Sequence, residues 1–265
     1  MASPQALTTH DDLGRQLSFD HPIERVVSLV PSLTEAIAYS EPELLVGATD
    51  WCTHPAELGV PRVGGTKSPD IDQILSLNVH LVIASKEENR QCDVGRLQEA
   101  GLPVWVTDIE DVPGALCSLG RILEVLSVPS RACRWLTEAQ RAWSSPTQVR
   151  PGPPVQVLVP IWRRPWMCLG PKTYAADVLR RLGVQLVSPP HPGRYPVFSP
   201  EEVGTAYPAE VALLPDEPYP FSAHDGPEAF SLPVAFVAGR ALTWYGPAMI
   251  EAPQEIVRSL RAVSI

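Results

Sequence analysis

The chain has 265 residues, a net charge of −9 and a hydrophobic fraction of 45%. This length is enough for one large domain or two modest ones, each with its own core. The negative charge and the lack of any Lys/Arg run argue against a nucleic-acid partner, because phosphate binding needs clustered basic residues. No apolar run approaches the length of a transmembrane helix, so we expect no insertion into a membrane.

The amino terminus and the cysteines bear on the compartment. The first 30 residues lack a basic segment followed by an apolar one, which is the pattern of a secretory signal peptide. Five cysteines are scattered without a CxxC pair, which is typical of a reducing compartment and argues against a structural zinc site. We therefore expect a cytoplasmic protein as numbered. The alternative is a periplasmic or cell-surface protein whose signal peptide was removed.

Strands and helices are predicted to alternate in the first half of the chain. Short apolar runs predict strands at 25–30, 44–49, 80–84 and 104–107, and helical patterns follow Pro31 and cover 90–99 and 112–125. This alternation is typical of an α/β domain with a parallel sheet.

Residues 68–88, SPDIDQILSLNVHLVIASKEE, predict a helix capped by Ser68 and then a buried strand that ends on acidic residues. The same order returns from Ser199, as SPEEVGTAYPAEVALLPDEP, with an interval of helix length before an apolar strand at 211–214. A Leu-Pro-Val sequence opens the next strand in both halves. We infer two α/β lobes related by internal duplication.

The connection between the predicted lobes is itself helical in pattern. Apolar residues recur at helical spacing from Ala132 to Trp143, which predicts one amphipathic bridging helix and a stiff joint. The expected organisation is an N-terminal lobe at 1–125, a bridging helix and linker at 126–151, and a C-terminal lobe at 152–265. The predicted fold class is α/β, with two Rossmann-like lobes joined by a single long helix and a ligand cleft between them.

Aromatic and polar side chains gather where the predicted strands end. Ligands of open α/β sheets bind at the carboxyl ends of the strands, and aromatic walls suit a flat, amphipathic ligand. The candidate ligand-binding residues at these ends and in the adjoining loops are Trp51, Lys67, Lys86, Glu87, Asn89, Trp162, Trp166, Glu217, Tyr219, Trp244 and Tyr245. The alternative is that these aromatic residues pack one loop against another.

Signals for catalysis are weak. No GxSxG elbow, HExxH motif or Cys/His pairing is present, and the adjacent acids Glu87 and Glu88 are typical of a solvated loop. Cys52 and His54 are close enough in sequence to meet a metal ion, although a histidine beside proline is more often a loop residue. We expect no enzymatic activity, no intrinsic cofactor and no metal held by the protein.

Several segments carry a resemblance to a known family. RVVSLVPSLTEAI, DWCTHP, PRVGGTKSPDIDQILSLNVHLVIASKEEN and GLPVWV resemble the amino-terminal lobe of vitamin B12-binding proteins, the helix-bridged (class III) substrate-binding proteins of ABC importers. DEPYPF and TWYGP resemble the related helical-backbone metal receptors. The resemblance extends into RYPVFSPEEV, covers most of the chain, and implies two α/β lobes joined by one long helix. It also adds Tyr195 and Thr66 to the candidate ligand-binding residues, since Trp51 and Tyr195 stand where relatives place cleft aromatics and Thr66 where they can carry a tryptophan.

The resemblance implies a monomeric binding protein for a corrinoid such as cobalamin, or for another large metal chelate. Haem and ferric siderophores are alternative ligands, and a cytoplasmic carrier or sensor is an alternative role; an enzyme acting on a tetrapyrrole is less favoured. One carboxylate in each lobe, Asp72 and Glu201 here, is implied to dock onto arginines of an ABC permease. The alternative for both acids is a favourable interaction with the dipole of their own helix.

Overall fold

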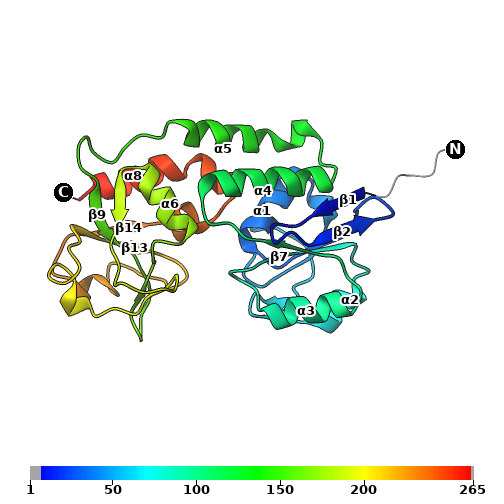
Figure 1. The fold of residues 1–265 in the computed structure, drawn as a ribbon, viewed down its shortest axis with the longest axis horizontal. Coiled ribbons are helices and arrows are strands. Elements are labelled where there is room, and N and C mark those ends of the chain that lie inside the picture. Colours follow the sequence, from blue (N-terminus) through cyan, green and yellow to red (C-terminus); the bar gives the residue numbers. More distant parts are fainter. Residues whose placement is uncertain (1–6, 264–265) are drawn as a thin grey trace. The chain divides into compact units, whose positions relative to one another are not determined.

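The computed structural model describes residues 7–263, which form two compact units (Figure 1). Unit 1 takes the chain up to Ile109, together with Ala115–Glu138 and Tyr245–Pro247. Unit 2 takes Glu110–Gly114, Ala139–Trp244 and the chain from Ala248 onward. Each unit is described on its own.

Unit 1 is built on a four-stranded parallel sheet with strand order β4-β3-β7-β8. The strands are β3 (Val26–Ser28), β4 (Leu45–Ala48), β7 (Leu81–Ser85) and β8 (Val104–Thr107). Its helices are α1 (Pro31–Ser40), α2 (Ile71–Ser76), α3 (Gln91–Glu99) and α4 (Val112–Val125), the last beginning in unit 2. Two antiparallel pairs complete it: β1 (Leu7–His10) with β2 (Gln16–Phe19), and β5 (Gly64–Gly65) with β6 (Ser68–Pro69).

Both faces of this sheet are buried. Alternate strand residues such as Val82, Ala84 and Val106 pack with α2 and α3 in one apolar cluster. α1 and α4 lie on the opposite side of the sheet (Figure 1). A parallel sheet covered on both faces explains why β7 reads as a continuous apolar run and not as an alternating one.

Unit 2 contains a second four-stranded parallel sheet, with order β12-β9-β13-β14. The strands are β9 (Val155–Leu158), β12 (Val184–Leu186), β13 (Val211–Pro215) and β14 (Val234–Val237), with a small antiparallel pair of β10 (Pro160–Trp162) and β11 (Met167–Cys168). The helices are α5 (Arg134–Ser144), which begins in unit 1, α6 (Tyr174–Arg181), α7 (Gly239–Thr243) and α8 (Ala252–Arg261). In each unit, the central sheet places its second strand in chain order at one edge, followed by the first, third and fourth. This shared order is what an internal duplication would leave.

The predicted α/β class with two parallel sheets is confirmed, and most elements lie close to their predicted bounds. The bridge is less uniform than expected, because a 3-10 turn at Ser130–Cys133 precedes α5. The chain also passes between the units within α4 and on either side of Tyr245–Pro247, which the sequence did not indicate.

Two predicted helix starts are wrong. Ser68 and Pro69 form strand β6, and the N-cap of α2 is Asp70, whose carboxylate accepts a hydrogen bond from the backbone N–H of Gln73 at 3.0 Å. After Ser199 the chain makes only a 3-10 turn, Pro200–Glu202. Val203 already has an extended backbone and Gly204 follows with a φ of +89°, so the turn does not continue and no counterpart of α2 forms there.

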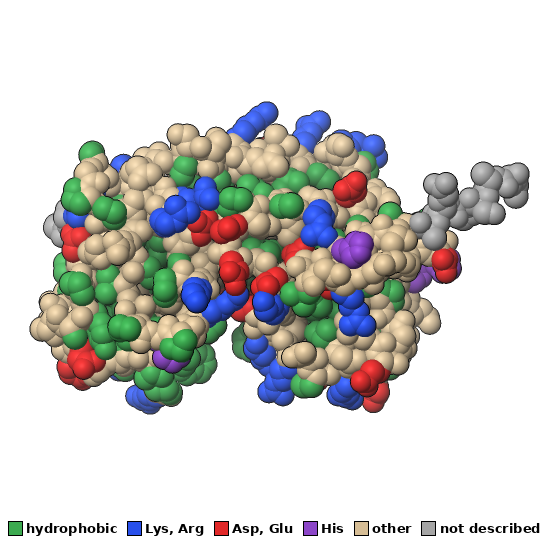
Figure 2. Space-filling view, viewed as in Figure 1, with side chains coloured by type: hydrophobic (Ala, Val, Ile, Leu, Met, Phe, Trp, Pro, Cys, Tyr) green, Lys and Arg blue, Asp and Glu red, His purple; other side chains and the backbone are tan. Residues whose placement is uncertain are grey.

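No helix within residues 7–263 has the length and apolar character needed to cross a membrane. On the face drawn in Figure 2, basic and acidic side chains are interspersed, and no broad basic surface is seen among the described residues.

Candidate functional site

Each sheet ends in a set of aromatic and charged side chains, and we call these sets the unit 1 surface and the unit 2 surface. The unit 1 surface comprises Trp51, Thr66, Lys67, Lys86, Glu87 and Asn89. The unit 2 surface comprises Trp162, Arg163, Trp166, Tyr219, Phe221 and Asp225.

Trp51 is the most exposed aromatic residue of the unit 1 surface. It lies in the turn after β4, and 65% of its surface is accessible to solvent. Its indole Nε1 lies 3.6 Å from the point where a Cβ on Gly65 would stand. Gly64 has a φ of +79°, and a Cβ there would lie 2.8 Å from the carbonyl oxygen of Ser68. Gly64 therefore makes room for strand β6, whereas Gly65 lies at ordinary contact distance from the Trp51 ring.

The loop after β7 is held by a network of hydrogen bonds centred on Asn89. The buried Asn89 amide accepts the backbone N–H of Ser85 at 2.8 Å and donates to the carbonyl oxygens of Thr66 at 2.9 Å and Leu29 at 3.3 Å. The Glu87 N–H donates to Ser85 Oγ at 3.2 Å. Since every polar atom named here has a partner, this loop has one well-defined conformation.

Two lysines project from the same loop region. Lys67 Nζ donates to the carbonyl oxygen of Glu87 at 2.7 Å, and Lys86 Nζ forms an ion pair with Asp108 at 2.5 Å. Both lysine side chains are largely exposed. The unit 1 surface therefore carries two exposed lysines, one of them paired with Asp108, and an exposed indole.

The unit 2 surface is an aromatic cluster. Trp166 stacks on Phe221 with ring centroids 5.8 Å apart, and Tyr219 lies 4.7 Å from Phe221. Trp162 meets Tyr219 edge-on at 5.8 Å and remains 44% exposed. These offset and edge-to-face contacts are the arrangements that aromatic rings prefer. Trp162 is the most exposed ring of the cluster.

Arg163 links this aromatic cluster to two nearby carboxylates through its guanidinium group. Its guanidinium lies 5.2 Å from the Trp166 ring centroid and pairs with Asp225 and, at 2.6 Å, with Glu228. Tyr219 donates its hydroxyl proton to Asp225 at 2.6 Å. The Arg163 side chain holds the pKa of Glu228 below its ordinary range. Sequence reasoning missed Arg163 and Asp225, although the run WRRPW carried a signal, since an arginine between tryptophans is well placed for cation–π contact.

Glu217, at the end of β13, occupies a more enclosed setting. Burial raises the pKa of its carboxyl group, which accepts a hydrogen bond from the Trp244 indole, while the neighbouring Arg240 favours the charged form. The Arg240 guanidinium lies 5.7 Å from the Trp244 ring centroid. Gly239 approaches Glu217 so closely that a Cβ would lie 2.8 Å from its carbonyl oxygen. The hydrogen bond between Glu217 and Trp244 therefore restrains both side chains inside unit 2.

Tyr195 lies in the loop between β12 and β13 and is half-buried. The loop is held by the preceding residue, since the carbonyl oxygen of Arg194 accepts the N–H of Gly170 at 2.7 Å and the Arg194 guanidinium pairs with Glu110. A Cβ on Gly170 would lie 2.8 Å from that carbonyl oxygen, so the contact requires glycine.

The structure separates the candidate residues by exposure. Trp51, Lys67, Lys86 and Trp162 are exposed; Thr66, Glu87, Trp166, Tyr195, Glu217 and Tyr219 are half-buried; Asn89, Trp244 and Tyr245 are buried. Only the first two groups present atoms that a ligand can reach without rearrangement.

No group of three His, Cys, Asp or Glu side chains in the described part of the chain is arranged to hold a metal ion. Cys52 is buried, with its sulfur 3.1 Å from Thr34 Oγ1 and 3.2 Å from Thr49 Oγ1, and burial raises the pKa of the thiol. His54 is exposed, and its Nδ1 lies 3.1 Å from Thr53 Oγ1.

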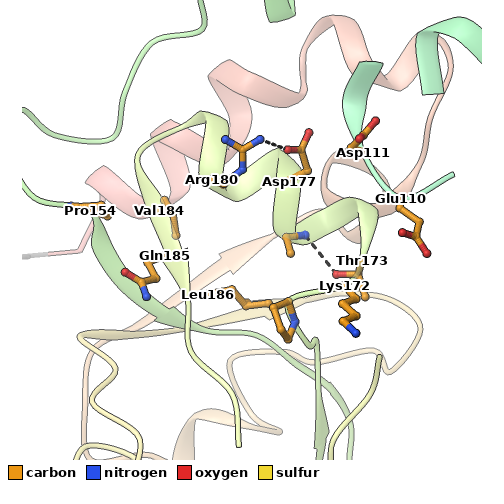
Figure 3. A pocket seen from close by; sticks show the side chains of 12 residues that line it. Glu110, Asp111, Pro154, Lys172, Thr173, Asp177, Arg180, Val184, Gln185 and Leu186 are labelled. Carbon is orange, nitrogen blue, oxygen red and sulfur yellow. Dashed lines mark hydrogen bonds and ion pairs between the residues drawn. The ribbon is translucent and has the colours of Figure 1, made fainter. Parts of the chain in front are cut away.

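Unit 2 also has an open groove of about 580 Å³ beside α6 and β12 (Figure 3). Asp177 on its wall pairs with Arg180 and, at 2.6 Å, with Arg181, and it accepts the Val112 N–H at 2.9 Å. The lining includes Pro154, just before β9 begins, so the groove reaches the amino end of that strand. Its charges are mostly satisfied internally, and we do not assign the ligand site to it.

Comparison with known proteins supports the same family of folds. No family model matches the chain. A vitamin B12-binding protein of Pectobacterium carotovorum is 23% identical over 248 residues, which cover 91% of this chain and 90% of the relative. A second one, from Vibrio parahaemolyticus, is 25% identical over 71% of this chain and 70% of its own length.

Solved structures extend the likeness. The periplasmic vitamin B12-binding protein of Vibrio cholerae superimposes with a TM-score of 0.75 at 18% identity, over 91% of this chain and 98% of that one. The periplasmic haem-binding protein of Roseiflexus sp. RS-1 gives 0.74 at 22% identity, over 90% and 98%. All of these relatives are named as binding proteins. The chain is thus a distant sequence relative of vitamin B12-binding proteins and has the two-lobed α/β fold of the periplasmic vitamin B12- and haem-binding proteins.

Proposed function

We propose that the protein binds a corrinoid such as cobalamin, or another large metal chelate, as the substrate-binding component of an ABC importer. The observation that carries this proposal is the pair of exposed tryptophans, Trp51 and Trp162, each placed at the carboxyl ends of a parallel sheet. Tryptophan is enriched at binding surfaces, and a planar macrocycle offers a large face for stacking on an exposed indole. The sequence and fold relatives named for vitamin B12 and haem support this ligand class.

Titration of the purified protein tests the proposal. Cyanocobalamin, haemin and a ferric siderophore are added separately while tryptophan fluorescence is followed. We expect saturable quenching by one of them, and at least about tenfold weaker binding in Trp51→Ala and Trp162→Ala, since each ring is an exposed anchor. A protein that responds to none of the three would not have the proposed function.

Haem is the second candidate, favoured by the charge of the unit 1 surface. Lys67 and Lys86 are exposed, the latter in an ion pair with Asp108, and haem carries two carboxylates whereas cyanocobalamin carries no net charge. Replacing both lysines with glutamine separates the two ligands. Loss of haemin affinity with rising salt, and more strongly in wild type than in the variant, supports haem, because screening weakens exposed charge pairs.

The import role adds a location and a partner. We propose that the protein works outside the cytoplasm, as its relatives named periplasmic do, and that its expected lobes at 1–125 and 152–265 each present one docking carboxylate. Cell fractionation of the native protein tests the location. Asp72 and Glu201 are the proposed docking residues; both are exposed.

A further inference from the structure

β14 is an edge strand of the unit 2 sheet, and β8 has the same place in the unit 1 sheet. A Leu-Pro-Val sequence opens both strands. The registers agree as well, since Val106 pairs with Ala84 of β7 and Phe236 pairs with Leu214 of β13. Val106 and Phe236 therefore occupy equivalent positions, yet the two sheets finish differently at this edge.

In unit 1 the turn of the β1–β2 hairpin covers the edge. The carbonyl oxygen of Val106 accepts the N–H of Asp12 at 3.2 Å, and the N–H of Val106 donates to Asp11 Oδ2 at 3.4 Å. The N–H of Asp108 donates to Asp12 Oδ2 at 3.2 Å. The side chain of Val106 is buried. The outer backbone groups at this end of β8 are therefore paired, which is one way in which proteins protect an edge strand.

In unit 2 the equivalent edge is open. The carbonyl oxygens of Pro233 and Val237 accept hydrogen bonds from β13, at 3.0 and 3.3 Å, so these alternate residues of β14 face the sheet. Val234 and Phe236 therefore point their N–H and C=O groups outward, and no residue within 7–263 forms a hydrogen bond with these groups. The Phe236 side chain is 42% exposed.

The surroundings of β14 add apolar surface and charge. The strand sequence VAFV contains neither a charged residue nor a proline, the residues that commonly prevent edge strands from pairing. α8 packs against β14 (Figure 1), and a groove of about 400 Å³ lies beside them. Its lining includes Phe236 and, on α8, Glu255 and Arg258. Neither of these two charged residues has an ion-pair partner in the described part of the chain.

We infer that this edge binds a second copy of the same chain, with β14 pairing antiparallel to β14 about a twofold axis at Ala235. Val234 of one copy then lies opposite Phe236 of the other. Opposite residues of this kind exchange both N–H···O bonds, so the outward N–H and C=O groups of both residues are paired in both copies. The Phe236 ring packs beside Val234 of the second copy on one face of the joined sheet.

A second copy fits this edge better than an unrelated peptide does, because the chain itself supplies every group that the pairing needs. The outward donors and acceptors are equal in number. The twofold axis also sets α8 of the two copies antiparallel on one face of the joined sheet, where Glu255 of one copy faces Arg258 of the other. The inference concerns assembly, so it does not depend on the ligand, and it differs from the monomer that the family resemblance implies.

Sedimentation velocity of the purified protein tests the pairing, over about a hundredfold range of concentration. We expect the average mass to rise towards twice that of a single chain only at high concentration, because a four-residue strand gives a small interface. Phe236→Lys should stay monomeric throughout. Tyr39→Lys is the matched control and should associate as wild type does, because Tyr39 is also an exposed aromatic residue but lies in α1 of unit 1.

Three results would overturn the inference: a wild-type mass of one chain at every concentration, growth beyond two chains, or equal association of Phe236→Lys. Charge reversal on α8 tests the twofold arrangement separately. Glu255→Lys and Arg258→Glu should each weaken association by about fivefold, because attraction becomes repulsion at both symmetry-related contacts. The double variant should recover most of the wild-type association, since its charges are again opposite. A double variant that associates no better than the single ones, while circular dichroism shows it to be folded, would contradict the antiparallel pairing.

Discussion

The two surfaces at the strand ends have the same place in their sheets but are held by different interactions. In unit 1 a buried amide, Asn89, organises a backbone loop through hydrogen bonds, and the exposed groups are one indole and two lysines. In unit 2 the rings of Trp166, Phe221 and Tyr219 pack against one another. Sheets with the same strand order can therefore carry chemically distinct ends.

The difference predicts how each surface responds to damage. Hydrogen bonds are directional, so loss of Asn89 leaves buried polar groups without partners and releases a particular loop. Aromatic packing is less directional, and its loss creates a cavity while the neighbouring rings can partly fill the space. We therefore expect the unit 1 surface to fix the orientation of the ligand, and the unit 2 surface to supply most of the apolar contact area.

The largest effect on stability is expected from Trp166→Ala. This ring contacts Phe198, Phe221 and Phe230 and is covered by Arg163. Its removal should lower the free energy of unfolding by about 3 kcal/mol, as for other core aromatic truncations. Urea denaturation followed by circular dichroism measures it. Trp162→Ala in the same cluster is the control and should cost less than about 1 kcal/mol, because that ring is largely exposed.

Asn89→Ala should have the next largest effect. It should lower the free energy of unfolding by about 2 kcal/mol, because the buried N–H of Ser85 loses its acceptor. Unlike Trp166→Ala, it should also abolish most ligand affinity, since the loop that carries Lys86 and Glu87 is no longer fixed. Parallel urea and fluorescence titrations give both values. If Trp166→Ala and Asn89→Ala lost ligand affinity in the same proportion to their loss of stability, the unit 1 surface would have no special role in orienting the ligand.

These two surfaces were not equally visible in the sequence. β7 and the polar residues after it were predicted because a continuous apolar run followed by charged residues has a local signature. Tyr245 is buried and belongs to unit 1, although it lies more than a hundred positions after the strands of that unit, and no local pattern indicates this. The Arg163 contacts with Asp225 and Glu228 depend on tertiary packing in the same way. The segment after Ser199 shows the opposite case, because a sequence pattern similar to the one at Ser68 forms only a 3-10 turn there.

Glu217→Gln should change the pH dependence of stability. The pKa of Glu217 is raised by burial, so this carboxyl group adds stability below its unfolded value of about 4.3 and loses it as pH rises through the folded pKa. The glutamine variant should therefore gain stability relative to wild type above that window and match it below. Thermal unfolding from pH 4 to 8 measures the effect.

Glu228→Gln provides the opposite sign within the same unit. Its pKa is lowered by Arg163, so its contribution is present above the unfolded pKa and is lost as pH falls. The variant should be less stable than wild type at neutral pH and should match it in acid. If the stability of both variants changed with pH in the same direction relative to wild type, burial would not be what sets the pKa of Glu217.

The smallest effect on the isolated protein is expected from the double change Asp72→Ala and Glu201→Ala. Asp72 lies in the first turn of α2, behind the Asp70 cap, whereas Glu201 lies in a 3-10 turn and accepts the Ser199 hydroxyl at 2.5 Å. That hydrogen bond lowers the pKa of Glu201, so its charge persists at neutral pH. If both acids dock onto permease arginines, ligand affinity and unfolding should be unchanged while uptake or permease binding falls, because Arg–carboxylate pairs act only in the complex. Asp70→Ala is the matched control, since it removes a cap and should lower stability by about 1 kcal/mol without a separate effect on docking. A double variant that loses stability as the control does, and keeps full uptake, would show that these carboxylates serve only their own turns.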